Sequence, residues 1–158
     1  MNVMNVPHVL MSGLVATTVL TLLLRGSVEL HFSRMDLPFI LGAGLTPDRD
    51  RAKMLGIAVH YGAGLAFSFL YAAFFAAVRP PSPWLGALLG LLHGGFVQII
   101  ALPLLPSLHP RMAATTRGPD PTPMLEPPGF LALNYGPHTP EVSLAAHMIY
   151  GLLLGALL

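Results

Sequence analysis

A run of 25 residues, 54–78, constrains the fold of this chain most strongly. It reads MLGIAVHYGAGLAFSFLYAAFFAAV and contains a single histidine, His60, but no Asp, Glu, Lys or Arg. As a helix rising roughly 1.5 Å per residue it would reach about 37 Å, more than the roughly 30 Å hydrocarbon core of a bilayer. The run therefore predicts a membrane-spanning helix.

The composition agrees with a membrane domain and excludes several functions. The chain is 54% hydrophobic and only 9% charged, against roughly 25% charged residues in soluble domains. A net charge of +1, with the basic residues in loops, argues against nucleic acid as a partner. Because the chain has no cysteine, disulfides, thiolate metal sites, iron–sulfur clusters and c-type haem are excluded. Any metal site would have to use His, Met, Asp or Glu side chains.

Three further apolar stretches predict spans at about 9–25, 84–105 and 142–158. With the span at 54–78 they predict an all-α, polytopic membrane protein, a four-transmembrane-helix up-down bundle forming one domain over residues 1–158. The segment 37–45 is too short to cross and is expected to form an interfacial or re-entrant turn. Thr46 is predicted to cap the second span, with Pro47 at its first position. Residues 106–141, rich in proline, are expected to form an extended loop without a core of its own.

Small side chains recur at four-residue intervals within the predicted spans. The first span carries Gly13, Thr17 and Thr21, and the third carries glycines at 86, 90 and 94. Narrow stripes of this kind let helix backbones approach closely in lipid. We expect both stripes to lie at helix–helix contacts.

The basic residues predict the orientation of the chain. They are concentrated in the segments 25–53 and 106–141, whereas the opposite side holds only Arg79 and the terminal amine. The positive-inside rule therefore places loops 26–53 and 106–141 in the cytoplasm and both termini outside. The first span is expected to be retained, because no basic n-region or clear cleavage site marks a signal peptide.

A short internal similarity links the second and fourth spans. Ala58, His60 and Gly64 share their spacing with a second set at positions 145, 147 and 151. Each span also follows another span and a long loop on the same side. This pattern is consistent with two parallel hairpin repeats, in which the two histidines would face each other from diagonal helices.

Histidines recur at a comparable depth in three of the spans. His60, His147 and His93 would lie roughly 9, 10 and 15 Å below the same membrane face in straight helices. Each lies beside small residues, so the three imidazoles are expected to point into the bundle. Ionisable side chains that converge inside a membrane are a functional-site hypothesis by default.

The histidine cluster permits three interpretations. The imidazoles could be structural, satisfied by neighbouring hydroxyls and carbonyls. They could hold a cofactor: His60 and His147, with His93, are candidate ligands of a b-type haem or of a Cu or Zn ion. They could also relay protons or substrate. No carboxylate lies inside a span, so no catalytic residue is predicted and an enzyme is not favoured.

Several stretches together resemble a group of known proteins. GLVATTVLT, MDLPFILGAG, the span around His60 and HMIYGLLLGALL are similar to small four-span integral membrane proteins of unknown function encoded in bacterial genomes. The resemblance implies the fold and a bacterial plasma (inner) membrane location, and it implies no activity.

The predicted function is a non-catalytic accessory or assembly subunit of a larger membrane complex, with the bilayer and other membrane subunits, or further copies of the chain, as partners. The alternatives are a haem- or transition-metal-binding membrane protein using the histidines and, third, a small oligomeric transporter.

Overall fold

The computed structural model describes residues 5–78, 80–114 and 124–158, so Arg79 and part of the long loop lie outside the described residues. In this part of the chain the regular structure is helical, with one isolated β-bridge between Met112 and Leu125. Four helical stretches are long and apolar enough to cross a membrane: α1 (Val6–Glu29), α3 (Arg49–Val78), the stretch Pro83–Leu108 and α6 (Thr139–Leu157). These are the four spans that the sequence predicted, each extended by a few residues at one end or both.

The third span continues through two prolines. It consists of α4 (Pro83–Phe96), a π-helical turn η1 (Val97–Ala101) and α5 (Leu102–Leu108). Pro103 lacks the N–H that would bond to a carbonyl four residues earlier, and the wider π-helical turn lies immediately before it. The prolines therefore alter the hydrogen-bond register of this span without ending it.

The segment predicted as an interfacial turn is a short helix, α2 (Leu37–Ala43). Its first turn is capped by Asp36, whose carboxylate accepts a hydrogen bond from the Phe39 N–H at 3.1 Å. The predicted cap of α3 was wrong by two residues. Helix α3 begins at Arg49, and Asp48 Oδ1 accepts from the Arg51 N–H at 2.8 Å. A carboxylate one residue before the helix caps it, because its oxygen reaches the first-turn N–H groups.

Glycine-mediated contacts hold the helices at close range, as the small-residue stripes predicted. A Cβ at Gly151 of α6 would meet the Gly86 carbonyl of α4 and would lie 2.8 Å from the Gly90 nitrogen. On the other side of the molecule, a Cβ at Gly13 of α1 would lie 2.5 Å from the Ser68 hydroxyl of α3. At these positions only glycine, which has no side chain, lets α4 approach α6 and α1 approach α3 this closely.

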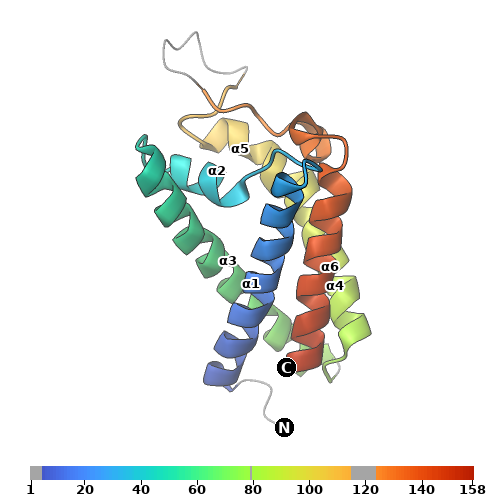
Figure 1. The fold of residues 1–158 in the computed structure, drawn as a ribbon. Helices are drawn as coiled ribbons and strands as arrows, with labels where there is room; N and C mark the ends of the chain where they lie inside the picture. The colour runs from blue at the N-terminus through green and yellow to red at the C-terminus, as the bar shows by residue number, and fades with distance from the viewer. Residues whose placement is uncertain (1–4, 79, 115–123) are drawn as a thin grey trace.

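The helices form an uneven arrangement around α1 and α6. Helix α6 packs extensively against α4 and also against α1, and α3 packs against α1 and α2. The backbones of α3 and α4, although these helices are consecutive in the chain, stay apart, and side chains such as Phe67 and His93 meet between them. Figure 1 shows α3 leaning away from the other spans toward α2. Buried side chains from α1, α3 and α6 form the main core: Val9, Ala16, Leu20, Leu24, Tyr71, Ala72, Phe75, Ala146, Tyr150, Leu154 and Leu158.

The start of α1 and the end of α6 lie at the same end of the molecule, opposite α2 and α5 (Figure 1). His8 of α1 and the carbonyl of Leu157 are 2.6 Å apart, so the Nε2–H donates across the two helix ends. The described segments of the two long loops gather at the other end. There the chain contains a short 3₁₀ helix, η2 (Phe130–Tyr135).

The loop 106–141 was predicted to lack a core, and for its described residues this is wrong. Side chains of that loop pack with α2, α5 and the segment before α2 in a second core: Met35, Ile40, Leu102, Met112, Ala132 and Tyr135. Met112 and Ala132 are completely buried. The few apolar residues of the loop are enough because they close over an apolar surface that the helices already provide.

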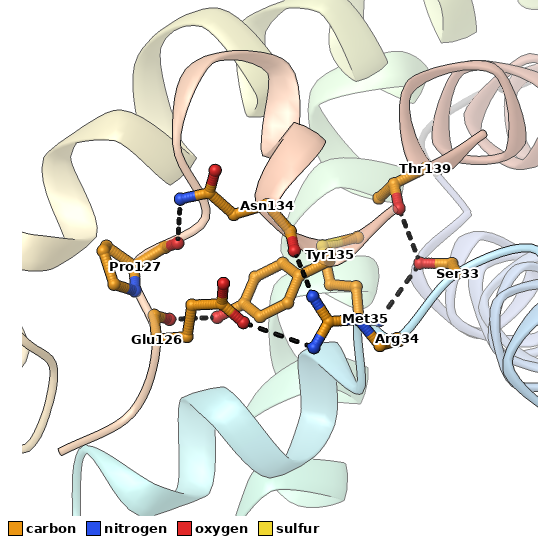
Figure 2. Close-up of polar contacts among 8 residues, drawn as sticks. All are labelled: Ser33, Arg34, Met35, Glu126, Pro127, Asn134, Tyr135 and Thr139. Carbon is orange, nitrogen blue, oxygen red and sulfur yellow. Dashed lines mark hydrogen bonds and ion pairs between the residues drawn. The ribbon is translucent and has the colours of Figure 1, made fainter. Parts of the chain in front are cut away.

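We call the loop segments that pack over this end of the molecule, together with α2 and α5, the loop cap, and Figure 2 shows polar contacts that hold it together. Arg34 donates to the Asn134 carbonyl at 2.5 Å and lies 3.4 Å from the Glu126 carboxylate. The Tyr135 hydroxyl donates to the Glu126 carbonyl at 2.5 Å. Burial, assisted by Glu126 and opposed by Arg34, raises the pKa of Tyr135 from 10.0 to about 12. The segment before α2 is thereby joined to the segment before α6.

A second polar link lies beside it. The hydroxyls of Ser33 and Thr139 are 2.9 Å apart, and Ser33 Oγ accepts from the Met35 N–H at 3.0 Å (Figure 2). Both hydroxyl-bearing residues are buried. The Arg34–Glu126 pair is largely exposed, and exposed ion pairs contribute little to stability. The buried Ser33–Thr139 hydroxyl pair is therefore the stronger constraint on the loop cap.

Candidate functional site

The three intramembrane histidines line one cavity. His60 reaches it from α3, His93 from α4 and His147 from α6. The cavity has a volume of about 190 Å³, is open on one side, and includes Tyr150 in its wall. Its remaining lining is apolar or glycine: Leu20, Leu37, Leu41, Ala63, Gly64, Phe67, Val97, Ala101, Leu102 and Leu105. The predicted convergence of the three imidazoles is therefore present, while their role as cofactor or metal ligands stays a prediction.

The ring of His60 has a defined proton position. Its Nε2 lies 3.1 Å from the Thr21 hydroxyl of α1. That hydroxyl donates its own proton to the Thr17 carbonyl at 2.6 Å, so toward His60 it acts as an acceptor. In a neutral ring His60 therefore carries its proton on Nε2, and the lone pair is on Nδ1.

His147 has the opposite arrangement. Its Nδ1 is 2.7 Å from the Ser143 carbonyl one turn earlier, and a carbonyl can only accept. The proton is therefore on Nδ1, and Nε2 carries the lone pair in the neutral ring. This is the arrangement found in many metal-bound histidines, where a carbonyl fixes the tautomer and leaves the other nitrogen to coordinate.

His93 occupies the space between the other aromatic groups. It stacks on Phe67 with ring centroids 3.8 Å apart and meets His147 edge-on at 4.9 Å. Its Nδ1 is buried and has no hydrogen-bond partner within the described residues, and the same is true of the Tyr71 hydroxyl nearby. Burying an unpaired polar atom costs about 1–3 kcal/mol, and Tyr71 does not line the cavity, so these two atoms are a cost to the packing around His93.

Tyr150 joins the two sides of the cavity. It is completely buried, and its hydroxyl donates to the Gly64 carbonyl of α3 at 2.6 Å. The sequence analysis expected neighbouring hydroxyls to satisfy the histidines, whereas this hydroxyl bonds to a backbone carbonyl of another helix. The Ala–His–Gly spacing shared by α3 and α6 places Gly64 and Tyr150 close to the two histidines, but no sequence signal indicates the bond itself.

The apolar part of the wall was not predicted. Leu37 and Leu41 come from α2, and Leu102 and Leu105 from α5. These helices lie at the loop end of the molecule in Figure 1 and close the cavity on that side. A leucine in a short apolar segment carries no pattern that distinguishes lining a cavity from touching lipid.

The other loop histidines do not extend the cluster. His109 is buried: its Nε2–H donates to the Ile40 carbonyl at 2.9 Å, and its Nδ1 accepts from the Arg111 N–H at 3.1 Å. It secures α2 because it bonds to that helix directly. His138 is exposed and lies 3.2 Å from the Glu141 carboxylate.

The chemistry open to this cavity is that of neutral imidazoles in an apolar wall. No carboxylate lines it, and in the described part of the chain no group of three or more His, Asp or Glu side chains is arranged to hold a metal ion. The site therefore offers hydrogen-bond acceptors, aromatic faces and apolar contacts, and it lacks a paired acid for general acid–base catalysis.

Comparison of this chain with protein-family models, with curated proteins and with solved structures found no match.

Proposed function

We propose that this protein binds a small, largely apolar molecule carrying a hydrogen-bond donor, such as a phenolic or alcoholic hydroxyl, in the cavity between His60, His93 and His147. The observation that carries the proposal is the convergence of imidazoles from three helices on one intramembrane cavity. Polar side chains inside a membrane are costly and are retained mainly where they bind or conduct something.

The tautomers favour a ligand that donates. His60 and His147 each use their N–H inside the protein, so each neutral ring has a lone pair left. These lone pairs are on Nδ1 of His60 and on Nε2 of His147. A ligand hydroxyl can donate to one of these nitrogens, whereas a ligand that only accepts has no imidazole N–H of His60 or His147 to use.

The dimensions favour a small head group. A cavity of about 190 Å³ is below the roughly 300–1,000 Å³ of drug-sized sites, so it accommodates one ring or a short chain end. The cavity is partly open, and its walls include α3 and α4, whose backbones stay apart and are bridged by side chains such as Phe67 and His93. We propose that the ligand enters from lipid between these two helices.

A matched pair of ligands tests the proposal. A hydrophobic phenol can donate a hydrogen bond and its methyl ether, which is larger by one carbon, cannot; both would be titrated into the purified protein in mild detergent. The phenol is expected to bind about two- to tenfold more tightly than the ether, the value of one neutral hydrogen bond. A double variant, His60→Phe with His147→Phe, removes both lone pairs and should abolish this difference, whereas His138→Phe, at an exposed histidine, should preserve it. Equal binding of phenol and ether by the native protein would refute the proposal.

A Cu or Zn ion is a second candidate, whereas a b-type haem, with its four pyrrole rings, does not fit a cavity of about 190 Å³. The observation favouring a metal ion is the hydrogen bond from His147 Nδ1 to the Ser143 carbonyl, which leaves Nε2 in the coordinating form. Elemental analysis of the purified protein, beside a His60→Ala, His147→Ala double variant, tests it. Stoichiometric copper or zinc that disappears in the variant supports the metal ion, and a metal-free native protein argues against it.

The bundle topology, the membrane and the orientation that the sequence predicts are part of the proposal. We infer an up-down four-helix bundle of two hairpin repeats in a bacterial inner membrane, with both termini outside and the loops 26–53 and 106–141 in the cytoplasm. The start of α1 and the end of α6 share one end of the molecule, which is compatible with that topology. A role as an accessory subunit is compatible with ligand binding, and co-purification of partner subunits tests it.

A further inference from the structure

A second cavity lies at the loop end of the molecule, and its polar lining is basic. It has a volume of about 380 Å³, and the described residues that line it include two guanidinium-bearing ones, Arg49 and Arg111, and no carboxylate. The remaining lining is apolar apart from one threonine: Phe39, Ala43, Thr46, Pro47, Ala52 and Leu125. Two like charges sharing a cavity repel each other unless an anion lies between them, so the lining itself indicates the charge of the occupant.

Arg111 is fixed in place by the protein. Its Nη1 donates to the Ala43 carbonyl at 2.7 Å and to the Gly44 carbonyl at 3.3 Å, at the C-terminal end of α2. A guanidinium carries five N–H donors, so these bonds leave further donors for a ligand. Because the carbonyls position the planar group without neutralising it, Arg111 keeps its charge and its orientation.

Arg49 is held without being neutralised. Its guanidinium carbon lies 6.0 Å from the centre of the Phe39 ring, a cation–π contact. Among the described residues it forms no ion pair. The nearby acids are engaged elsewhere: Asp48 caps α3, and Asp50 lies 3.4 Å from Lys53. Arg49 is also the first residue of α3, where the helix dipole favours a negative charge.

We propose that Arg49 and Arg111 bind the phosphate of an anionic phospholipid at the membrane surface. Guanidinium groups suit phosphate oxygens because their donors match them in pairs, and basic pockets beside membrane-spanning helices bind anionic head groups. The apolar lining of the cavity continues onto α3, which crosses the membrane, so a lipid can contact both the cavity and the helix. This site is separate from the histidine cavity, whose lining shares no residue with it.

Native mass spectrometry of the purified protein with added lipid tests the site. The native chain is expected to retain phosphatidylglycerol in preference to zwitterionic phosphatidylcholine. Arg49→Gln should weaken phosphatidylglycerol binding about tenfold, the lower value of one hydrogen bond to a charged group. Arg51→Gln removes the same charge from an exposed side chain outside the cavity and should leave binding unchanged. Arg111 is unsuitable for this test because it also secures α2.

Three outcomes would overturn the proposal. One is the absence of any preference for phosphatidylglycerol. Another is an equal loss in the Arg49→Gln and Arg51→Gln variants, which would indicate a diffuse surface charge. The third is displacement of the lipid by inorganic phosphate in a manner that depends on Arg49, which would assign the site to free phosphate. Arg49→Lys should retain part of the binding, because it keeps the charge and loses the paired donors.

Discussion

The contact between α4 and α6 predicts a large effect for a very small substitution, Gly151→Ala. A methyl group at this position would point at the Gly86 carbonyl and would lie 2.8 and 2.9 Å from the nitrogen and Cα of Gly90. All three are backbone atoms within another helix, so they cannot rotate away as the end of a flexible side chain could. The two helices must therefore separate.

The size of the effect follows from two opposing contributions. Inserting a methyl group into a packed contact costs about 1–3 kcal/mol. Replacing glycine by alanine inside a helix returns up to about 1 kcal/mol through helix propensity. We therefore expect Gly151→Ala to lower the free energy of unfolding by about 1–2 kcal/mol, although alanine is the better helix former.

Gly95→Ala is the matched control, because a Cβ at Gly95 meets nothing within 4 Å. It should leave stability unchanged or raise it by up to about 1 kcal/mol. Far-UV circular dichroism during unfolding in a graded mixture of mild detergent and dodecyl sulfate would compare both variants with the native chain. If Gly151→Ala were as stable as Gly95→Ala, the close packing of α4 on α6 would be refuted.

Three further substitutions test, in turn, the Tyr135 contact of the loop cap, the N-terminal cap of α2 and the hydrogen bond between α3 and α6. The pKa of Tyr135 is raised from 10.0 to about 12, so the stability that its neutral hydroxyl contributes is fully present below pH 10 and is lost as the pH rises to 12. Tyr135→Phe should remove that loss in alkaline melts, and an unchanged pH profile would contradict the burial of the phenol. Asp36→Ala should cost about 1 kcal/mol and speed hydrogen exchange at the Phe39 amide, whereas unaltered exchange there would exclude the cap. Tyr150→Phe removes the bond to the Gly64 carbonyl and should cost about 0.6 kcal/mol in thermal melts, and a gain in stability would count against that bond.

The spans were predictable because the bilayer imposes a simple requirement on length and polarity. Runs such as 54–78 satisfy it whatever their tertiary contacts, and the fold matches them. The inward direction of the histidines was predictable for a related reason. Gly64 and Gly151 lie four residues after His60 and His147, so each pair shares a helix face, and that face must be the packed one.

The loop cap, in which α2 and the loop segments pack together, was not predictable by the same reasoning. Helix α2 has seven residues, too few for a periodic pattern, and it is held by Arg111 and His109, which lie far away in the sequence. The loop core depends on Met112 and Ala132, isolated apolar residues among prolines. Where structure rests on long-range contacts of single residues, the sequence has no local signal to read.

The histidine cavity can be tested most directly by ¹⁵N NMR of the imidazole rings in detergent, during titration with a hydrophobic phenol. The account predicts that the ring nitrogens of His60, His93 and His147 shift on binding, with the lone-pair nitrogens Nδ1 of His60 and Nε2 of His147 moving most. The exposed His8 and His138 should not respond. Shifts at the exposed rings alone, or a protonated nitrogen at the positions assigned a lone pair, would contradict it.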